Sequence, residues 1–156
     1  MNLTFRKATI EDIDILVESR IEVLRAANKL PADALMPEVE IETRNYYHKA
    51  LPAGDITSIL VFDGDKFIGS GAVSYYKIMP TYHNPGGSKA YIMNMYTNPE
   101  YRRQGIAYKT LDMLIEDCKS RGVTAISLEA TEMGRPLYEK YGFIKMNDEM
   151  EFIWKK

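Results

Sequence analysis

Residues 98–111 read NPEYRRQGIAYKTL, with two arginines, a glutamine and a glycine just ahead of a predicted helix. The amino end of a helix offers unpaired backbone N–H groups and the positive end of the helix dipole, so it binds anions. Gly105 has no Cβ and lets phosphate oxygens approach these amides, while Arg102 and Arg103 add positive charge. The stretch therefore predicts a phosphate cradle between a strand and a helix. An ordinary helix start with solvated arginines fits the same residues, because short glycine motifs match by chance.

Length and composition limit the kinds of protein that this sequence can encode. The 156 residues predict one domain, residues 1–156, and a net charge of −2 argues against a nucleic-acid partner. One cysteine excludes an internal disulfide framework, and with only two histidines no metal-ligand cluster is legible. The amino terminus lacks the features of a signal peptide, and no window is apolar over the length of a membrane span. We therefore expect a cytoplasmic protein with no metal and no membrane partner.

Hydrophobic periodicity gives the expected order of helices and strands. A short first strand is followed by two helices, and then by two strands joined by a turn at 63–66. A mostly apolar strand at 89–97 precedes the cradle and its helix. A fifth strand, a short helix and a last hairpin of 143–145 with 150–154 complete the chain. The order β-α-α-β-β-β-α-β-α-β-β predicts an α/β (α+β) fold, in which helices cover both faces of a central mixed sheet.

Two motifs carry a resemblance to a known family. Arg102, Gly105 and Ala107 occupy the places of an Arg/Gln-x-x-Gly-x-Gly/Ala motif, and residues 137–143 read LYEKYGF. With these motifs in this order, the chain resembles the GCN5-related N-acetyltransferases (GNAT), whose acetyl-CoA motif and Leu-Tyr-Glu-Lys-x-Gly-Phe motif they match. The resemblance extends over the whole element order, although residues 1–55 match only as a helical pattern. It implies the GNAT-like acyl-CoA N-acyltransferase fold and acetyl-CoA as the co-substrate.

The resemblance also implies where acetyl-CoA is held. In this family the pyrophosphate rests on amides of the motif loop, and the pantetheine arm pairs with the end of the central strand beside a neighbouring strand that splays away. Many members have an asparagine where this chain has Thr131, a substitution that leaves one hydroxyl able to donate a hydrogen bond. The cofactor-binding residues implied are Met95, Tyr96, Thr97, Arg102, Arg103, Gln104, Gly105, Ile106, Ala107 and Thr131.

The resemblance assigns catalytic roles less completely. Tyr138 occupies the family position that donates a proton to the departing thiolate, and the same ring also fits a purely packing role. Some members have a glutamate on the central strand as general base, but the nearest counterpart here is Tyr91. Glu129, at the end of the fifth strand, is the best carboxylate candidate for the general base. A glutamate that simply faces solvent at the edge of the sheet is an equally good interpretation of this residue. Deprotonation relayed by water needs no dedicated base.

The acceptor is expected to be a primary amine on a small molecule or a peptide. In this fold the first two helices and the loop before the central strand line the acceptor pocket, which points to Glu38, Glu40, Glu42, Tyr46, Tyr47, Tyr75, Tyr76, Tyr82 and His83. Members of the family often pair through their carboxyl-terminal strands, so the apolar tail is compatible with a homodimer and equally with completion of the core. The alternative function is a non-catalytic acyl-CoA-binding sensor or assembly module on the same fold.

Overall fold

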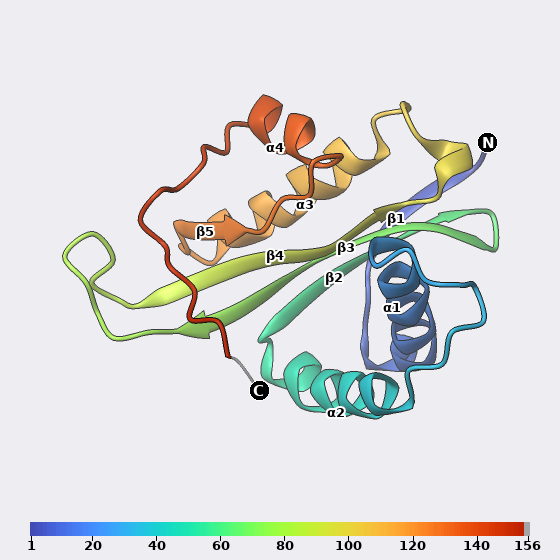
Figure 1. The fold of residues 1–156 in the computed structure, drawn as a ribbon, viewed down its shortest axis with the longest axis horizontal. Helices are drawn as coiled ribbons and strands as arrows, with labels where there is room; N and C mark the ends of the chain where they lie inside the picture. The colour runs from blue at the N-terminus through green and yellow to red at the C-terminus, as the bar shows by residue number, and fades with distance from the viewer. Residues whose placement is uncertain (155–156) are drawn as a thin grey trace.

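The computed structural model describes residues 1–154 and shows one mixed sheet with helices on both faces (Figure 1). Single turns of 3-10 helix precede α1 and α3. The elements are β1 (Leu3–Lys7), α1 (Ile13–Ala27), α2 (Pro37–Ala53), β2 (Ile56–Asp63), β3 (Lys66–Lys77), β4 (Ser88–Thr97), α3 (Ile106–Ser120), β5 (Ala125–Leu128) and α4 (Arg135–Tyr141). From β1 to α4 this is the order that the sequence predicted, and the α/β mixed-sheet fold class is confirmed.

The five strands lie in the order β1-β2-β3-β4-β5. Neighbours are antiparallel except β4 and β5, which run parallel because α3 carries the chain back along the sheet between them. The turn between β2 and β3 is the tight one expected at 63–66, with Gly64 at a φ of 59°. The sequence therefore builds an antiparallel meander with one parallel strand added at its edge.

Each face of the sheet has its own hydrophobic core, because strand side chains alternate between the faces. Ile59, Val73 and Ile92 point to the face covered by α3, where they join Leu111 and Leu114. A second, smaller core lies under α1 and α2 and is built from Leu16, Val17, Tyr47, Ala50, Ile56, Leu60 and Ala72. Figure 1 shows α3 and α4 on one side of the sheet and α1 and α2 on the other.

The expected hairpin at the carboxyl end is the exception to the predicted order. The structure assigns no strand to residues 143–154. Met150, Phe152, Ile153 and Trp154 are all mostly exposed there. An isolated two-stranded hairpin is marginal in water, and these side chains find no apolar surface that would compensate for ordering it. The prediction of two final strands at 143–145 and 150–154 is therefore wrong for the described chain.

A buried carboxylate on α3 ties this helix to three strands. Asp117 accepts hydrogen bonds from Lys7 Nζ of β1 at 2.7 Å, Thr57 Oγ1 of β2 at 2.8 Å and the Tyr75 hydroxyl of β3 at 2.6 Å. Arg121 Nε lies 3.2 Å from the same carboxylate. Burial alone would raise the pKa of Asp117, but the bonds from Lys7, Tyr75 and Thr57 outweigh it and hold the pKa below its ordinary value.

No helix within residues 1–154 combines the length and the apolar character needed to cross a bilayer. The same residues contain no cluster of three or more histidine, cysteine, aspartate or glutamate side chains arranged to hold a metal ion.

Asp117→Asn should lower the free energy of unfolding at pH 7 by about 1.5–3 kcal/mol, the usual worth of hydrogen bonds to a buried charged group. Because the folded state lowers the pKa of Asp117, its contribution is complete above the unfolded pKa of about 4 and is lost as pH falls from there through the lower folded pKa. The gap between wild type and variant in urea denaturation should therefore shrink as pH falls below about 4.

Asp14→Asn is the matched control, because Asp14 forms an ion pair with Arg44 while its side chain is 82% exposed. Such surface pairs contribute about 0–1 kcal/mol. Equal losses for the two variants, or a gap for Asp117→Asn that persists unchanged at pH 3, would contradict the assigned role.

Candidate active site

The parallel strands β4 and β5 separate part of the way along β4. Their pairing ends at Ile92 and Leu128, while β4 continues to Thr97. On its other side β4 stays paired with β3, with Gly69 opposite Thr97. Residues 93–97 therefore keep one edge of the backbone free of a strand partner. A free strand edge offers donors and acceptors to an extended ligand.

A bulge in β4 lies at the start of this free edge. Met93 is opposite Ala72 and Tyr96 is opposite Ser70, so Asn94 and Met95 share the single partner Gly71. Asn94 has a φ of 59°, in the left-handed region that asparagine tolerates better than most residues. The Ser70 hydroxyl donates to the Asn94 carbonyl at 2.8 Å and holds the bulge to β3.

The extra residue changes which side chains reach each face of the sheet. Ala90 and Ile92 belong to the core under α3, so strict alternation would also send residue 94 there. Instead Met93 and Asn94 both line a cavity on the α1–α2 face, and Met95 packs into the α3 core. The bulge thus places a polar side chain in the cavity beside the free edge.

Gly71 makes room for this arrangement. A Cβ at residue 71 would lie 2.6 Å from Met95 Sδ and 2.7 Å from Thr110 Cγ2. Such distances are well inside van der Waals contact, so only glycine fits without a shift of β3, β4 or α3. Gly71 is therefore both the residue opposite the bulge and a point where β3, β4 and α3 approach closely.

The loop before α3 presents a row of backbone donors. Arg103 and Gly105 have φ values of 64° and 78°, and Gly105 is the N-cap residue of α3. Within residues 1–154, no backbone acceptor outside the helix takes the N–H groups of residues 103–108; the first such bond runs from Lys109 N to the Gly105 carbonyl. Successive N–H groups in turns of this kind form a concave anion site. Open space surrounds the Cα of Gly105, which suits an anion resting on these amides.

The remaining predicted cofactor residues are on β4, beside it or ahead of α4. Tyr96 donates a long hydrogen bond of 3.5 Å to Glu22, and Arg102 is near enough to the Tyr96 phenol to influence its pKa, which burial raises. Thr97 Oγ1 is buried and has no hydrogen-bond partner within residues 1–154. Thr131 accepts a hydrogen bond from Gly134 N at 3.1 Å ahead of α4, so its own O–H remains able to donate.

Tyr138 lies on the α3 face near the strand separation. It belongs to the same buried cluster as Ile92, against which Met95 and Leu128 also pack. Its ring meets Phe143 edge-on at 6.0 Å between centroids. Burial is the only cause that raises the pKa of the Tyr138 phenol, so the hydroxyl stays protonated at neutral pH.

Glu129 directly follows the last paired residue of β5 and is exposed. Burial raises the pKa of Tyr91, and the carboxylates of Glu129 and Glu149 raise it further. Glu129 is thus near Tyr91, and it is absent from the residues that line the cavity on the α1–α2 face.

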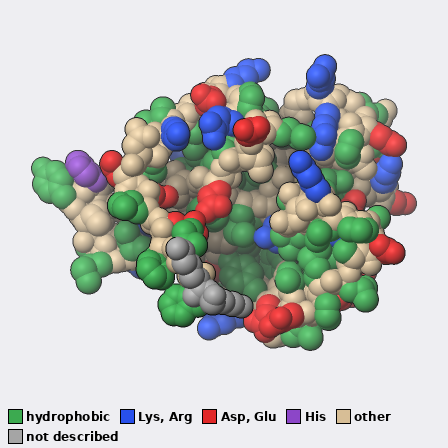
Figure 2. Space-filling model, viewed as in Figure 1, with side chains coloured by type: hydrophobic (Ala, Val, Ile, Leu, Met, Phe, Trp, Pro, Cys, Tyr) green, Lys and Arg blue, Asp and Glu red, His purple; other side chains and the backbone are tan. Residues whose placement is uncertain are grey.

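The cavity on the α1–α2 face has a volume of about 510 Å³. Figure 2 shows a hollow near the middle of this view, with hydrophobic side chains at its bottom. The sequence pointed to four of its residues, Glu38, Glu42, Tyr46 and Tyr47; Glu40, Tyr75, Tyr76, Tyr82 and His83 do not line it. The lining residues are Arg20, Glu38, Val39, Glu42, Thr43, Tyr46, Tyr47, Ile56, Ala72, Ser74, Met93 and Asn94.

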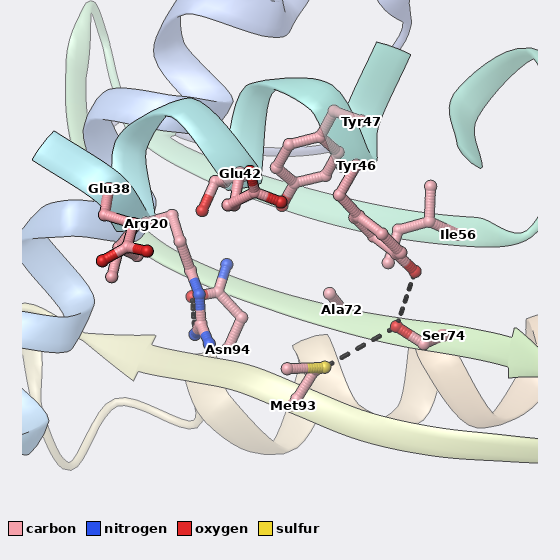
Figure 3. A pocket seen from close by; sticks show the side chains of 12 residues that line it. Arg20, Glu38, Glu42, Tyr46, Tyr47, Ile56, Ala72, Ser74, Met93 and Asn94 are labelled. Carbon is pink, nitrogen blue, oxygen red and sulfur yellow. Dashed lines mark hydrogen bonds between the residues drawn. The ribbon is translucent and has the colours of Figure 1, made fainter. Parts of the chain in front are cut away.

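Four polar lining residues were missed by sequence reasoning: Arg20, Thr43, Ser74 and Asn94. Arg20 Nη1 donates to Asn94 Oδ1 at 3.0 Å (Figure 3). Its position could have been found, because residue 20 lies three and four positions after Val17 and Leu16, on the apolar stripe of α1. Asn94 gives no such signal, since its orientation depends on the bulge.

Comparisons with known proteins agree with this geometry. The family model described as the acetyltransferase (GNAT) family matches residues 24–143. A crystal structure of a predicted acetyltransferase with acetyl-CoA from Clostridium acetobutylicum is similar, with 32% identity, a TM-score of 0.87 and coverage of 97% of this chain and 96% of that one.

Two proteins of known sequence are also similar. The uncharacterized N-acetyltransferase YsnE of Bacillus subtilis is 33% identical over 57% of this chain and 56% of its own length, so the match spans little more than half of that relative. A glucosamine 6-phosphate N-acetyltransferase of Trypanosoma brucei brucei is 25% identical over 86% of this chain and 85% of its own length.

Gly71→Ala should destabilise the protein by about 1–3 kcal/mol, because its Cβ would push against Met95 and against Thr110 of α3. Gly86→Ala is the matched control, since a Cβ there meets nothing within 4 Å. The control should be neutral or slightly stabilising. Urea denaturation compares the two, and equal stability of the variants would show that the bulge does not need a glycine opposite it.

Proposed function

The chain belongs to the GNAT acetyltransferase family, and we propose that it transfers an acetyl group from acetyl-CoA to a primary amine. One observation carries the proposal. The N–H groups of residues 103–108, which have no backbone acceptor within residues 1–154, follow the free edge of β4 at 93–97 after a single turn of 3-10 helix, Pro99–Tyr101. A ligand with a pyrophosphate at one end and an extended amide-bearing arm at the other fits this junction.

The pyrophosphate would rest on the amides of Arg103, Gln104, Gly105, Ile106 and Ala107. Charge-assisted hydrogen bonds from several N–H groups, together with the dipole of α3, favour a multiply charged anion there. The exposed guanidinium groups of Arg102 and Arg103 add attraction. Thr131 would contribute its free O–H to the cofactor arm.

The pantetheine arm would pair with Met95, Tyr96 and Thr97 and take the place of the missing strand. Its amides would use the free backbone groups of this edge. The buried Thr97 hydroxyl, which has no partner in the described part of the chain, is on the same segment. The thioester carbonyl would then accept a backbone N–H near Met95. This bond stabilises the negative charge that develops on the oxygen as an amine attacks.

The amine would approach from the cavity on the α1–α2 face and attack the thioester directly. Holding both reactants in line lowers the barrier without a covalent enzyme intermediate. The name of the Trypanosoma relative makes glucosamine 6-phosphate a sensible first acceptor to assay. Before the attack the amine must lose a proton, for which Glu129 would act as general base, either directly or through water.

Collapse of the tetrahedral intermediate leaves a thiolate, which Tyr138 would protonate. Burial keeps this phenol in its protonated form, as the role requires. Tyr138 shares its buried cluster with Ile92, and Met95 packs against that cluster. The hydroxyl would therefore act from the α3 face, opposite the entering amine.

Gly105→Asp should weaken acetyl-CoA binding at least about tenfold relative to Gly105→Asn, as measured by calorimetric titration. The two side chains have the same shape and both tolerate the left-handed backbone of residue 105, so only the added negative charge differs. The gap should shrink as salt is raised. Equal acetyl-CoA affinity of the two variants would contradict the proposal that the pyrophosphate binds at this loop.

Failure of the folded wild type to bind acetyl-CoA would overturn the proposed function. Tight binding of acetyl-CoA without acetylation of any amine would instead favour a non-catalytic acyl-CoA-binding module.

Tyr138→Phe should lower kcat about 100-fold or more, the usual contribution of a general acid, and leave acetyl-CoA affinity unchanged. Tyr141→Phe on the same helix is the matched control, because the Tyr141 hydroxyl donates to Asp112 at 2.6 Å in an exposed position. The control should keep its kcat. Wild-type turnover by Tyr138→Phe would leave this ring with a packing role alone.

A further inference from the structure

Arg20 is a cation that lines the cavity and has no carboxylate partner among residues 1–154. It is half-buried on α1, and burial lowers the pKa of its guanidinium. An arginine nevertheless stays charged at neutral pH. Removing such a charge from water is unfavourable unless hydrogen bonds or an opposite charge compensate for it.

The protein supplies little of that compensation. The ion pairs of Arg6, Arg44 and Arg121 are with nearby aspartates, whereas no ion pair within residues 1–154 includes Arg20. Its one hydrogen bond is to the neutral Asn94 amide. A guanidinium carries five N–H donors in a planar fork that matches a carboxylate or a phosphate. Most of the donor capacity of Arg20 is thus available to a ligand in the cavity.

The unused donors of Arg20 lie close to the proposed site of acetyl transfer. Asn94 is the bulge residue that starts the free edge of β4, so the guanidinium is held beside the place where the acetyl group would arrive. Figure 3 shows the Arg20 and Asn94 side chains at one end of the cavity. At the other end the Tyr46 hydroxyl lies 2.9 Å from Ser74 Oγ, which donates to Met93 Sδ.

We propose that the acceptor is an amine that also carries a carboxylate or a phosphate, and that Arg20 binds this anionic group. The proposal rests on the acetyl transfer proposed above and narrows its acceptor. The anion on Arg20 anchors one end of the acceptor, which leaves the amine free to turn towards the thioester. Glu38 and Glu42 line the cavity from α2 and favour the cationic amine over a second anion.

The test compares amines in matched pairs. Glucosamine 6-phosphate is paired with glucosamine, and β-alanine with β-alanine amide, so that each pair differs in one anionic group. For wild type, Arg20→Gln and Arg20→Lys, acetylation gives the ratio of kcat/KM between the charged and the neutral member. Calorimetric titration of the same amines measures binding independently of turnover. The phosphate and carboxylate pairs together distinguish the two anions.

We expect the wild type to prefer the anionic member of at least one pair. In Arg20→Gln the ratio should fall about 10–100-fold, the cost of losing a charge-assisted pair of hydrogen bonds. Arg20→Lys should keep part of the preference, because it retains the charge without the planar fork.

Two results would overturn the proposal. One is a wild type that prefers the anionic member of neither pair, whether or not it binds or acetylates the neutral members. The other is a ratio that Arg20→Gln leaves unchanged, which would mean that Arg20 only holds Asn94 and the bulge. Titration of acetyl-CoA and of the amines separates these results from failure of the proposed function, which would appear as a wild type that does not bind acetyl-CoA or that binds it and acetylates no amine.

Discussion

The separation of β4 from β5 after Ile92 and Leu128 is the constraint on which the rest of the site depends. A strand inside a sheet is hydrogen-bonded to a neighbour along each of its two edges. Because β5 stops pairing early, residues 93–97 of β4 have backbone N–H and C=O groups with no strand partner on that side. The bulge at Asn94 begins where the pairing ends, and it turns one extra side chain to the α1–α2 face. Gly71, opposite the bulge, allows both strands to stay packed on α3. One irregularity thus creates the free edge and orients the cavity.

Asp117 fixes the position of the loop before α3, although it lies near the opposite end of that helix. It lies near the carboxyl end of α3 and bonds to β1, β2 and β3, so the helix cannot slide along the sheet. An α-helix is stiff and rises about 1.5 Å per residue, so fixing one end also fixes the donors at the other. The cradle before Ile106 is therefore held against the end of β4 by a carboxylate that takes no part in binding.

The sequence predicted those parts of the molecule that depend on local pattern. The turn at Gly105, the start of α3 and the helix that carries Tyr138 follow from glycine placement and apolar spacing, which act over a few residues. The position of Asn94 follows from the register between β3 and β4, which no local pattern encodes. Arg20 stands on an apolar stripe, yet only the folded cavity shows what it faces. The final hairpin failed because β-propensity without a surface to cover does not order a strand.

Hydrogen-bonding capacity that the fold does not use gathers in one region of the molecule. Folding normally satisfies buried donors and acceptors, as the crowded surroundings of Asp117 illustrate. Within residues 1–154 the buried Thr97 hydroxyl has no partner, and the half-buried guanidinium of Arg20 donates only to Asn94. Ser58 Oγ is the other buried side-chain atom without a partner in this part of the chain. A buried polar group without a partner costs free energy in the unliganded fold, so Thr97 and Arg20 together argue for ligands that meet at the free part of β4.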